Sequence, residues 1–323
     1  MTPFPGMPFP RHRSRRHAVK SRLLPLVACC ACLAVMGCTF PAAARTLRAV
    51  ASFTVLADVV RQVGGAHVDV TSLVPPDGDP HEFEPAPADA RRLQDADLIF
   101  LSGDGLETWF VRLARAAGYH GAPVTVSDGI VTRDMRENGR DVTDPHVWNS
   151  VPNVEIWTRN IRDALVRADP DDADAFRASA DAYLGRLQAL DRYVRERIAT
   201  VPPDRRRVLT GHTGFGYFGR EYGVTFIAPQ GLSTETEPAA ADIAALIRQI
   251  RALGVSTYFV ENTADPRLVQ QVARATDTRP GGTMYVESLS PPGGPAPDYL
   301  SMIRHDVDLM VPAMMASRQA PPP

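Results

Sequence analysis

One stretch of the sequence, residues 171–199, determines how the two halves of the chain are joined. It reads DDADAFRASADAYLGRLQALDRYVRERIA. Its apolar residues recur every three or four positions: Phe176, Ala180, Tyr183, Leu184, Leu187, Leu190 and Val194. This spacing predicts one long amphipathic helix. Pro170 marks its start, because proline lacks the amide donor needed inside a helix but is favourable at a helix N-terminus. At about 1.5 Å per residue the helix would run roughly 40 Å, which is long enough to connect two lobes.

Short apolar runs alternate with helical patterns on both sides of this helix. Before it, the sequence predicts strands and helices in turn at residues 47–53, 55–63, 68–74, 87–96, 98–102, 106–117 and 124–127. After Pro202-Pro203 the same alternation is predicted at residues 207–210, 225–228, 238–253, 257–260, 265–276, 284–286 and 298–310. Such alternation is typical of parallel sheets covered by helices.

The expected fold class is therefore α/β, with two lobes that each hold a mainly parallel sheet flanked by helices and that are joined by a long connecting helix. The predicted segments are a signal peptide at 1–44, an N-terminal α/β lobe at 45–168, the connecting helix at 169–201, a C-terminal α/β lobe at 202–316 and a disordered tail at 317–323.

Residues 1–44 have the features of an export signal. A basic segment ends at Arg22, and the apolar run that follows is too short to span a bilayer comfortably. Ala42-Ala43-Ala44 satisfies the small-x-small cleavage rule, which favours a soluble periplasmic product. The alternative is a lipid anchor, since residues 35–38 resemble a lipobox that would leave Cys38 at the N-terminus.

The charge and cysteine content of the mature chain narrow its function. Without the leader it holds 29 basic and 37 acidic side chains, a formal charge of −8, which is poorly suited to nucleic acid. All four cysteines lie in or beside the leader, at Cys29, Cys30, Cys32 and Cys38. Any metal site must therefore use histidine and carboxylate ligands.

Three histidines occur in loops that follow strand or turn signals and precede helices: His81, His146 and His212. Ligands of open parallel sheets bind in such loops, at the carboxyl ends of the strands. His81 and His146 both stand in Asp-Pro-His, where proline stiffens the approach to the imidazole. A lone loop histidine would be explained more simply as a solvated side chain, but three in one context favour a metal site.

Six motifs, in order, resemble those of the zinc- and manganese-specific solute-binding proteins of bacterial ATP-binding-cassette (ABC) importers. They are VPPDGDPHEFEP (74–85), DPHVW (144–148), TGHTGFGYF (210–218), FVEN (259–262), GTMYVESLS (282–290) and YLSMIRH (299–305). The resemblance covers nearly all of residues 50–310.

The resemblance implies that four loops, two from each lobe, supply four ligands to a buried metal ion. His81 and His146 match the ligands of the first lobe, and His212 matches the first ligand of the second lobe. Glu287 stands where the family usually has an aspartate in Tyr-x-Asp-Ser-Leu. The implied protein is a periplasmic monomer that delivers a divalent ion to an importer permease in the inner membrane.

Three imidazoles and one carboxylate suit the tetrahedral habit of zinc, whereas manganese prefers more oxygen ligands. In the manganese-specific relatives the position of His212 is typically a glutamate. The expected ion is therefore Zn²⁺, with Mn²⁺ or iron as the alternative. Glu261, at the end of a predicted strand, would either orient a ligand or cap the next helix.

Two other classes of function are alternatives to a protein that captures and delivers a metal ion. A zinc hydrolase also uses three protein ligands, but the chain has no His-Glu-x-x-His pair and no recognisable nucleophile turn, so we expect no enzyme. A surface adhesin is the other alternative.

Residues 131–142 are charged and hold no histidine, which fits either a mobile flap near His146 or a solvated loop.

Overall fold

The structure is a computed structural model that describes residues 46–137, 140–229 and 239–316. The predicted signal peptide (1–44) and the predicted tail (317–323) lie outside the described residues. The lobe boundaries proposed from the sequence stay a prediction. The first lobe is the part of the chain around the first sheet, and the second lobe is the part around the second sheet.

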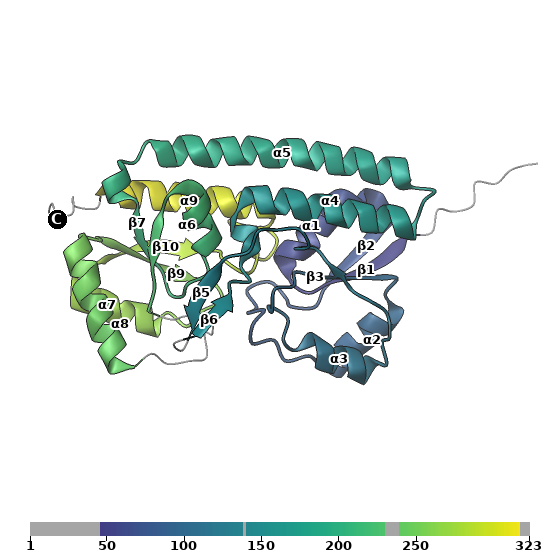
Figure 1. The fold of residues 1–323 in the computed structure, drawn as a ribbon, viewed down its shortest axis with the longest axis horizontal. Helices are drawn as coiled ribbons and strands as arrows, with labels where there is room; N and C mark the ends of the chain where they lie inside the picture. Colours follow the sequence, from purple (N-terminus) through teal and green to yellow (C-terminus); the bar gives the residue numbers. More distant parts are fainter. Residues whose placement is uncertain (1–45, 138–139, 230–238, 317–323) are drawn as a thin grey trace, which may run out of the picture. The chain divides into compact units, whose positions relative to one another are not determined.

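The first sheet has the strand order β2-β1-β3-β4, and all of its strands are parallel (Figure 1). Its strands are β1 (Leu47–Ala51), β2 (Val68–Ser72), β3 (Leu98–Leu101) and β4 (Val124–Thr125). The helices between them are α1 (Thr54–Gly64), α2 (Pro87–Asp95) and α3 (Phe110–Ala117), with a 3-10 turn at Gly65–His67.

The second sheet has the strand order β10-β9-β7-β8 and is also parallel. Its strands are β7 (Arg207–Leu209), β8 (Thr225–Ile227), β9 (Thr257–Glu261) and β10 (Arg279–Met284). Its helices are α6 (Gly216–Tyr222), α7 (Ala240–Leu253) and α8 (Arg267–Thr276). Each sheet therefore places its second strand outside its first, so the winding reverses between β1 and β3 and between β7 and β9. Ligands of such sheets bind beside this reversal, at the carboxyl ends of the strands.

The prediction for the last strand was wrong. The sequence predicted it at Met284–Val286, whereas β10 spans Arg279–Met284 and shifts register between Pro280 and Thr283. Tyr285 has left the ladder, because its amide donates to Oδ1 of Asp306 at 3.0 Å. Met284 is the last residue of β10, and Tyr285 and Val286 are buried in the loop that follows.

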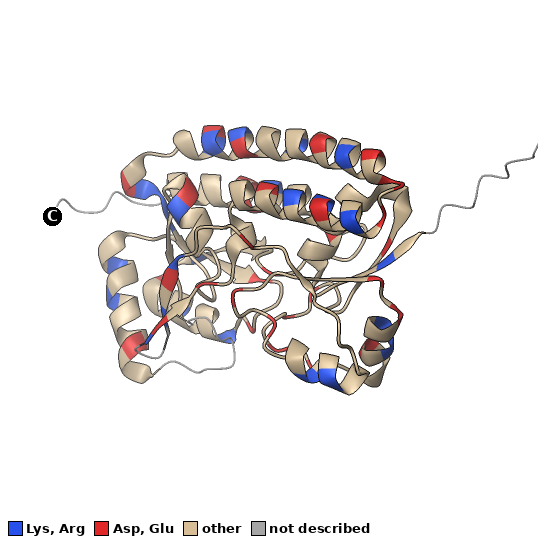
Figure 2. Cartoon of the chain, turned by 45° about the vertical axis from the view of Figure 1, so that its right-hand side comes forward, with Lys and Arg blue, Asp and Glu red and all other residues tan. Residues whose placement is uncertain are grey.

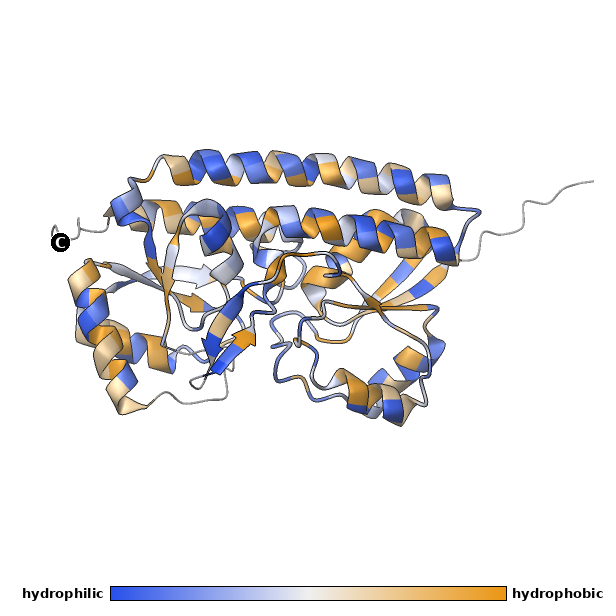
Figure 3. Ribbon diagram, in the orientation of Figure 1, coloured by the Kyte–Doolittle hydropathy of each residue, from blue (hydrophilic) through white to orange (hydrophobic). Residues whose placement is uncertain are grey.

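Three long helices pack together: α4 (Val151–Ala168) and α9 (Tyr299–Ala316) each contact α5 (Ala173–Ala199). The predicted connecting helix is α5, and it contacts α1 and α4 of the first lobe and α6 and α9 of the second. All seven of its predicted apolar positions are buried. Figure 3 shows the mixed colouring along α4 and α5 that is expected of helices with one buried face. The predicted fold class is confirmed.

One hydrophobic core runs beneath both sheets. It joins Phe53 and Phe100 of the first lobe to Phe259 and Met284 of the second, and it includes the buried faces of α4, α5 and α9. A second, smaller core lies between the second sheet and the pair α7 and α8: Leu209, Ile227, Leu246, Ile250, Val255, Val269 and Val272.

The charged segment at residues 131–142 contains an antiparallel hairpin, which the sequence analysis did not predict. Its strands are β5 (Asp134–Glu137) and β6 (Arg140–Thr143), and Met135 pairs with Val142 across it. Elsewhere basic and acidic residues are interspersed along the outer helices (Figure 2), with pairs such as Arg195 and Asp191 on α5 at 2.8 Å.

Candidate metal centre

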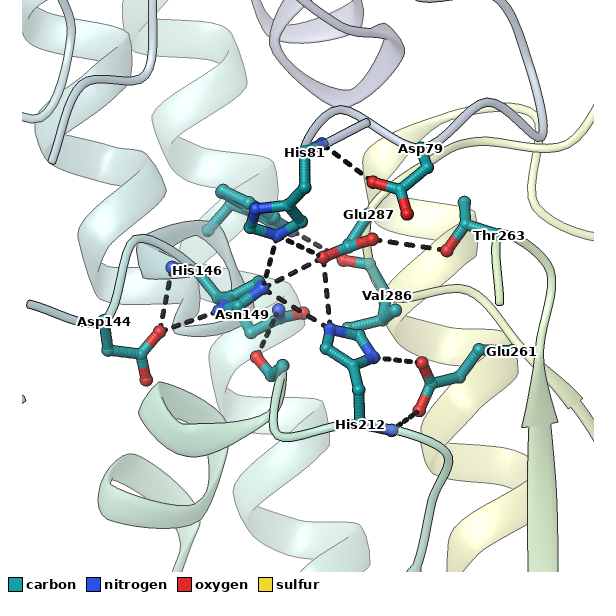
Figure 4. A network of polar contacts seen from close by, with 12 residues as sticks. Asp79, His81, Asp144, His146, Asn149, His212, Glu261, Thr263, Val286 and Glu287 are labelled. Atoms are coloured by element: carbon teal, nitrogen blue, oxygen red, sulfur yellow. Dashed lines mark hydrogen bonds and ion pairs between the residues drawn. The ribbon is translucent and has the colours of Figure 1, made fainter. Parts of the chain in front are cut away.

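The four residues predicted as ligands come together between the two sheets (Figure 4). His81 lies in the loop after β2, and His146 lies between β6 and the 3-10 turn Val147–Asn149. His212 follows β7 and Glu287 follows β10. His146, His212 and Glu287 are fully buried, and the side chain of His81 is 11% exposed.

Each imidazole directs its Nε2 atom at the same carboxylate oxygen. The distances to Glu287 Oε1 are 2.8 Å from His81, 2.9 Å from His146 and 3.1 Å from His212. The Nε2 atom of His146 lies 3.1 Å from that of His81 and 3.4 Å from that of His212. The facing nitrogens of His81 and His146 and a carboxylate oxygen of Glu287 therefore form one mutually close set that could hold a metal ion, and His212 adjoins this set through His146 and Glu287.

The separations among His81, His146 and Glu287 suit a bound cation. In a tetrahedral zinc site with bonds of about 2.0–2.1 Å, neighbouring ligand atoms lie about 3.3 Å apart. The separations among His81, His146 and Glu287, 2.8 to 3.1 Å, lie slightly below that value, and His212 lies at 3.1 Å from Glu287 and 3.4 Å from His146. Several imidazole nitrogens converging in a dry site are costly unless a proton or a metal ion lies between them.

The two Asp-Pro-His motifs share one local structure. Asp79 Oδ1 accepts the amide of His81 at 2.7 Å, and Asp144 Oδ1 accepts the amide of His146 at 3.0 Å. Each aspartate therefore closes a turn onto the residue two positions later, as aspartate commonly does. The repeated tripeptide fixes the backbone of both histidines before any ion binds.

Asp144 also orients the ring of His146. Its Oδ1 atom lies 2.8 Å from His146 Nδ1, which leaves Nε2 to face the candidate site. Burial opposes protonation of His146, but the hydrogen bonds to Asp144 and Glu287 outweigh it and raise the pKa of the imidazole. Burial likewise disfavours the charged form of Asp144, yet its contacts with His146 and Arg133 lower the pKa of this carboxyl.

Glu261 plays the corresponding part for His212. Its Oε1 atom accepts the amides of Gly211 at 2.9 Å and His212 at 3.2 Å, and its Oε2 atom contacts His212 Nδ1. Of the two roles that the sequence left open for Glu261, the contacts support the orienting one. Burial lowers the pKa of His212, but the charges of Glu261 and Glu287 raise it well above its usual value.

Glu287 presents one oxygen to the histidines and holds the other outside the set. Its Oε2 atom accepts the hydroxyl of Thr263 at 3.3 Å. Burial favours the neutral carboxyl, but the charges of His81 and His212 and two imidazole hydrogen bonds lower the pKa of Glu287 well below its usual value.

Hydrogen bonds from side chains to backbone carbonyls fix the ligand loops relative to one another. The indole of Trp148 donates to the carbonyl of Val286 at 2.6 Å, so the loops of His146 and Glu287 are joined. The amide side chain of Asn149 donates to the carbonyl of Gly214 at 3.0 Å, which joins the loops of His146 and His212. The site is therefore largely formed in advance.

Replacement of Glu261 by glutamine should lower metal affinity about 10- to 100-fold, the range for residues that orient a metal-bound histidine. Glutamine keeps one oxygen as the acceptor for the two backbone amides, but the NH2 group that replaces the other oxygen cannot accept the Nδ1 proton of His212. Competition with a chelator would measure the change. Asp265→Asn is the matched control, because Asp265 is an exposed acid that pairs with Arg267. Equal affinities for the two variants would contradict an orienting role.

The fold and the buried cluster define a class of protein: a metal-binding receptor made of two parallel α/β lobes. Residues 49–313 match the family described as "ZnuA: Zinc-uptake complex component A periplasmic", and the chain belongs to this family. It is thus a periplasmic-type metal-binding component of an ABC transporter, whose partners are a membrane permease and a metal ion. The expectation that it is not an enzyme is confirmed, because the family consists of substrate-binding proteins.

Individual relatives agree with this assignment. The chain is 32% identical to "Manganese-binding lipoprotein MntA" of Halalkalibacterium halodurans over 82% of its length and 87% of that protein. It is also 32% identical to "Iron-binding protein YfeA" of Yersinia pestis, over 82% and 85% of the two chains. A manganese-bound mutant of the periplasmic metal-binding protein from candidatus liberibacter asiaticus superposes with a TM-score of 0.76 at 28% identity, covering 83% and 99%.

Within the described ranges, no helix combines the length and the apolar character needed to cross a membrane.

Proposed function

We propose that His81, His146, His212 and Glu287 hold a Zn²⁺ ion that the protein captures and delivers to the permease. The observation that supports this most strongly is the convergence of three Nε2 atoms on one oxygen of Glu287, at 2.8 to 3.1 Å. Asp144 and Glu261 would stabilise the bound state by accepting the Nδ1 protons of two ligands.

The position of Glu287 favours zinc over the alternatives. Its Oε2 atom is engaged by Thr263, so the carboxylate offers one oxygen to the ion. A single oxygen with three imidazoles gives four-coordination, which suits zinc. Manganese and iron would be served better by a second carboxylate oxygen, because they accept more ligands and manganese prefers oxygen.

Capture of Mn²⁺ or iron is the second candidate. It is supported by the names of the relatives, which include a manganese-binding lipoprotein and an iron-binding protein. A rotation of the Glu287 side chain that releases Thr263 would provide the extra oxygen. The two candidates therefore differ in whether one or both oxygens of Glu287 bind the ion.

Affinity measured in vitro does not decide between these ions, since nearly any such site binds zinc more tightly than manganese. The deciding measurement is the metal content of the protein purified from its native compartment, in cells grown with limiting but equal zinc, manganese and iron. We expect zinc at about one ion per chain. Manganese or iron in its place would overturn the zinc proposal and leave the carrier role intact.

We further propose that the protein acts outside the cytoplasmic membrane as a monomer. The lipoprotein names of several relatives support a lipid anchor at Cys38, whereas Ala42-Ala43-Ala44 supports cleavage to a soluble product. The mass of the mature N-terminus distinguishes the two, and light scattering tests the oligomeric state.

A further inference from the structure

The hairpin β5–β6 is linked to His146 through a short chain of polar groups. Arg133, the residue before β5, directs Nη1 at Oδ2 of Asp144, while Oδ1 of the same carboxylate contacts the ring of His146. Backbone contacts hold this arrangement, since the amide of Asp144 donates to the carbonyl of Arg133 at 2.9 Å. The hydroxyl of Tyr217 accepts the amide of Arg133 at 3.2 Å and donates to the carbonyl of Asp144 at 2.9 Å.

Charge balance gives Arg133 a specific role when the ion is bound. Asp144 is fully buried, and a buried carboxylate is costly unless a cation compensates it. A metal-bound His146 must be neutral, because the ion occupies the nitrogen that a second proton would take. Arg133 is then the cation in contact with Asp144.

The surrounding backbone leaves room for this guanidinium. Gly216 begins α6, and a methyl group there would overlap Arg133 Nη1 and lie 2.5 Å from Asp144 Oδ2. The guanidinium is also partly open to solvent, with 31% of the Arg133 side chain exposed. It lines a groove of about 720 Å³ between the hairpin, α6 and β8. The chain of contacts therefore runs from an accessible surface to a fully buried candidate ligand.

We infer that Arg133 is a positioning residue for metal binding: through Asp144 it holds the imidazole of His146 in the orientation and tautomer that the ion requires. The hairpin thereby sets how fast the ion leaves the site. This inference rests on the proposed role of His146 as a ligand. It adds a residue that touches neither the ion nor any of the four proposed ligands.

The test compares Arg133→Met with Arg136→Met. Arg136 lies three residues further along, in β5, and pairs with Asp141 in solvent at 3.1 Å. Two quantities are measured on the full mature protein: the rate of Zn²⁺ loss to a chelator in stopped flow, and the absorption spectrum of the Co²⁺-loaded protein, which reports the number and geometry of the ligands. Arg133→Met should lose zinc about 10- to 100-fold faster and show an altered cobalt spectrum.

Two further variants separate positioning from a loss of folding. Arg133→Lys keeps the charge and should restore part of the slow dissociation. Gly216→Ala keeps Arg133 but displaces its guanidinium, and should speed zinc loss in the same direction. Arg136→Met should match the unaltered protein in both measurements.

The possible outcomes distinguish this inference from the proposed function. If the unaltered protein binds zinc and cobalt and Arg133→Met matches it in rate and spectrum, the role of Arg133 is overturned while the proposed function stands. If the unaltered protein gives no cobalt spectrum and retains no zinc, both fail. Faster zinc loss in Arg133→Met with an unchanged cobalt spectrum and no recovery in Arg133→Lys also overturns the role, because it would indicate a general loosening of the hairpin.

Discussion

Replacement of His212 by alanine is expected to weaken zinc binding roughly 100- to 1000-fold. Metal sites with four protein ligands gain about 10–16 kcal/mol on binding zinc, so one ligand contributes about 2.5–4 kcal/mol, which corresponds to that loss of affinity. His212 is fully buried, and its removal also leaves Glu261 without the imidazole that it contacts.

Competition against a zinc chelator of known affinity would measure this loss. His120→Ala is the matched control, because His120 is an exposed histidine of the first lobe. Thermal unfolding of the metal-free variant checks that the fold survives. An affinity within threefold of the control would exclude His212 from the set of ligands.

Zinc binding should also weaken steeply in acid. The pKa values of His146 and His212 are raised in the metal-free protein, so protons compete with the ion for both imidazoles more strongly than for free histidine. While both titrate, affinity should fall by up to about 100-fold per pH unit. A series of chelator competitions between about pH 8 and pH 5.5 would show this dependence, and a flat profile would contradict it.

The stability of the metal-free protein should depend on pH in the opposite sense. A histidine whose pKa is raised on folding stabilises the folded state. This contribution to the free energy of unfolding is fully present below the unfolded pKa of 6.5 and is lost as the pH rises through the folded pKa. Glu287, whose pKa is lowered on folding, stabilises the folded state above pH 4.5. This contribution is lost as the pH falls through the folded pKa of Glu287. These groups together favour the metal-free fold between about pH 4.5 and 6.5.

The difference between the unfolding temperatures measured with and without zinc separates the pH dependence of the metal site from that of other ionisable groups. That control is needed because burial also raises the pKa values of Asp58, Glu107 and Asp306. The difference should grow with pH, since stabilisation by a ligand follows its affinity. His212→Ala should flatten the curve, and an equally steep curve in that variant would assign the effect to other groups.

Periodicity predicted the connecting helix well, because one apolar face buried along its whole length leaves a long three-to-four repeat. It failed at Tyr285 and Val286, since burial in a loop produces the same apolar run as burial in a strand. The hairpin β5–β6 was missed although Asn138-Gly139, the dipeptide between its strands, is a strong turn signal. Its strands DMRE and RDVT are largely polar, and Met135 is buried while most of the others remain accessible.

The four candidate ligands could be selected from the sequence because each lies in a distinctive motif. The residues that orient these ligands were harder to predict from the sequence. Asp144 stands in the motif itself, and its capacity to close a turn and hold the ring two residues later was a readable signal. Glu261 meets His212 only through the tertiary fold, which brings β9 beside β7. Arg133 meets Asp144 across the base of the hairpin β5–β6, which was not predicted.

The core that is continuous under both sheets constrains how cargo leaves the protein. Separating the halves as rigid bodies would expose that core, and wetting even about 400 Å² of it would cost about 10 kcal/mol at about 25 cal/mol per Å². This is comparable to the whole stability of a typical domain, about 5–15 kcal/mol. Shifting one ligand loop by breaking a few hydrogen bonds costs far less. Unloading at the membrane is therefore cheapest as a local event, in which the permease bends a single loop out of place while the rest of the receptor stays folded around its common interior.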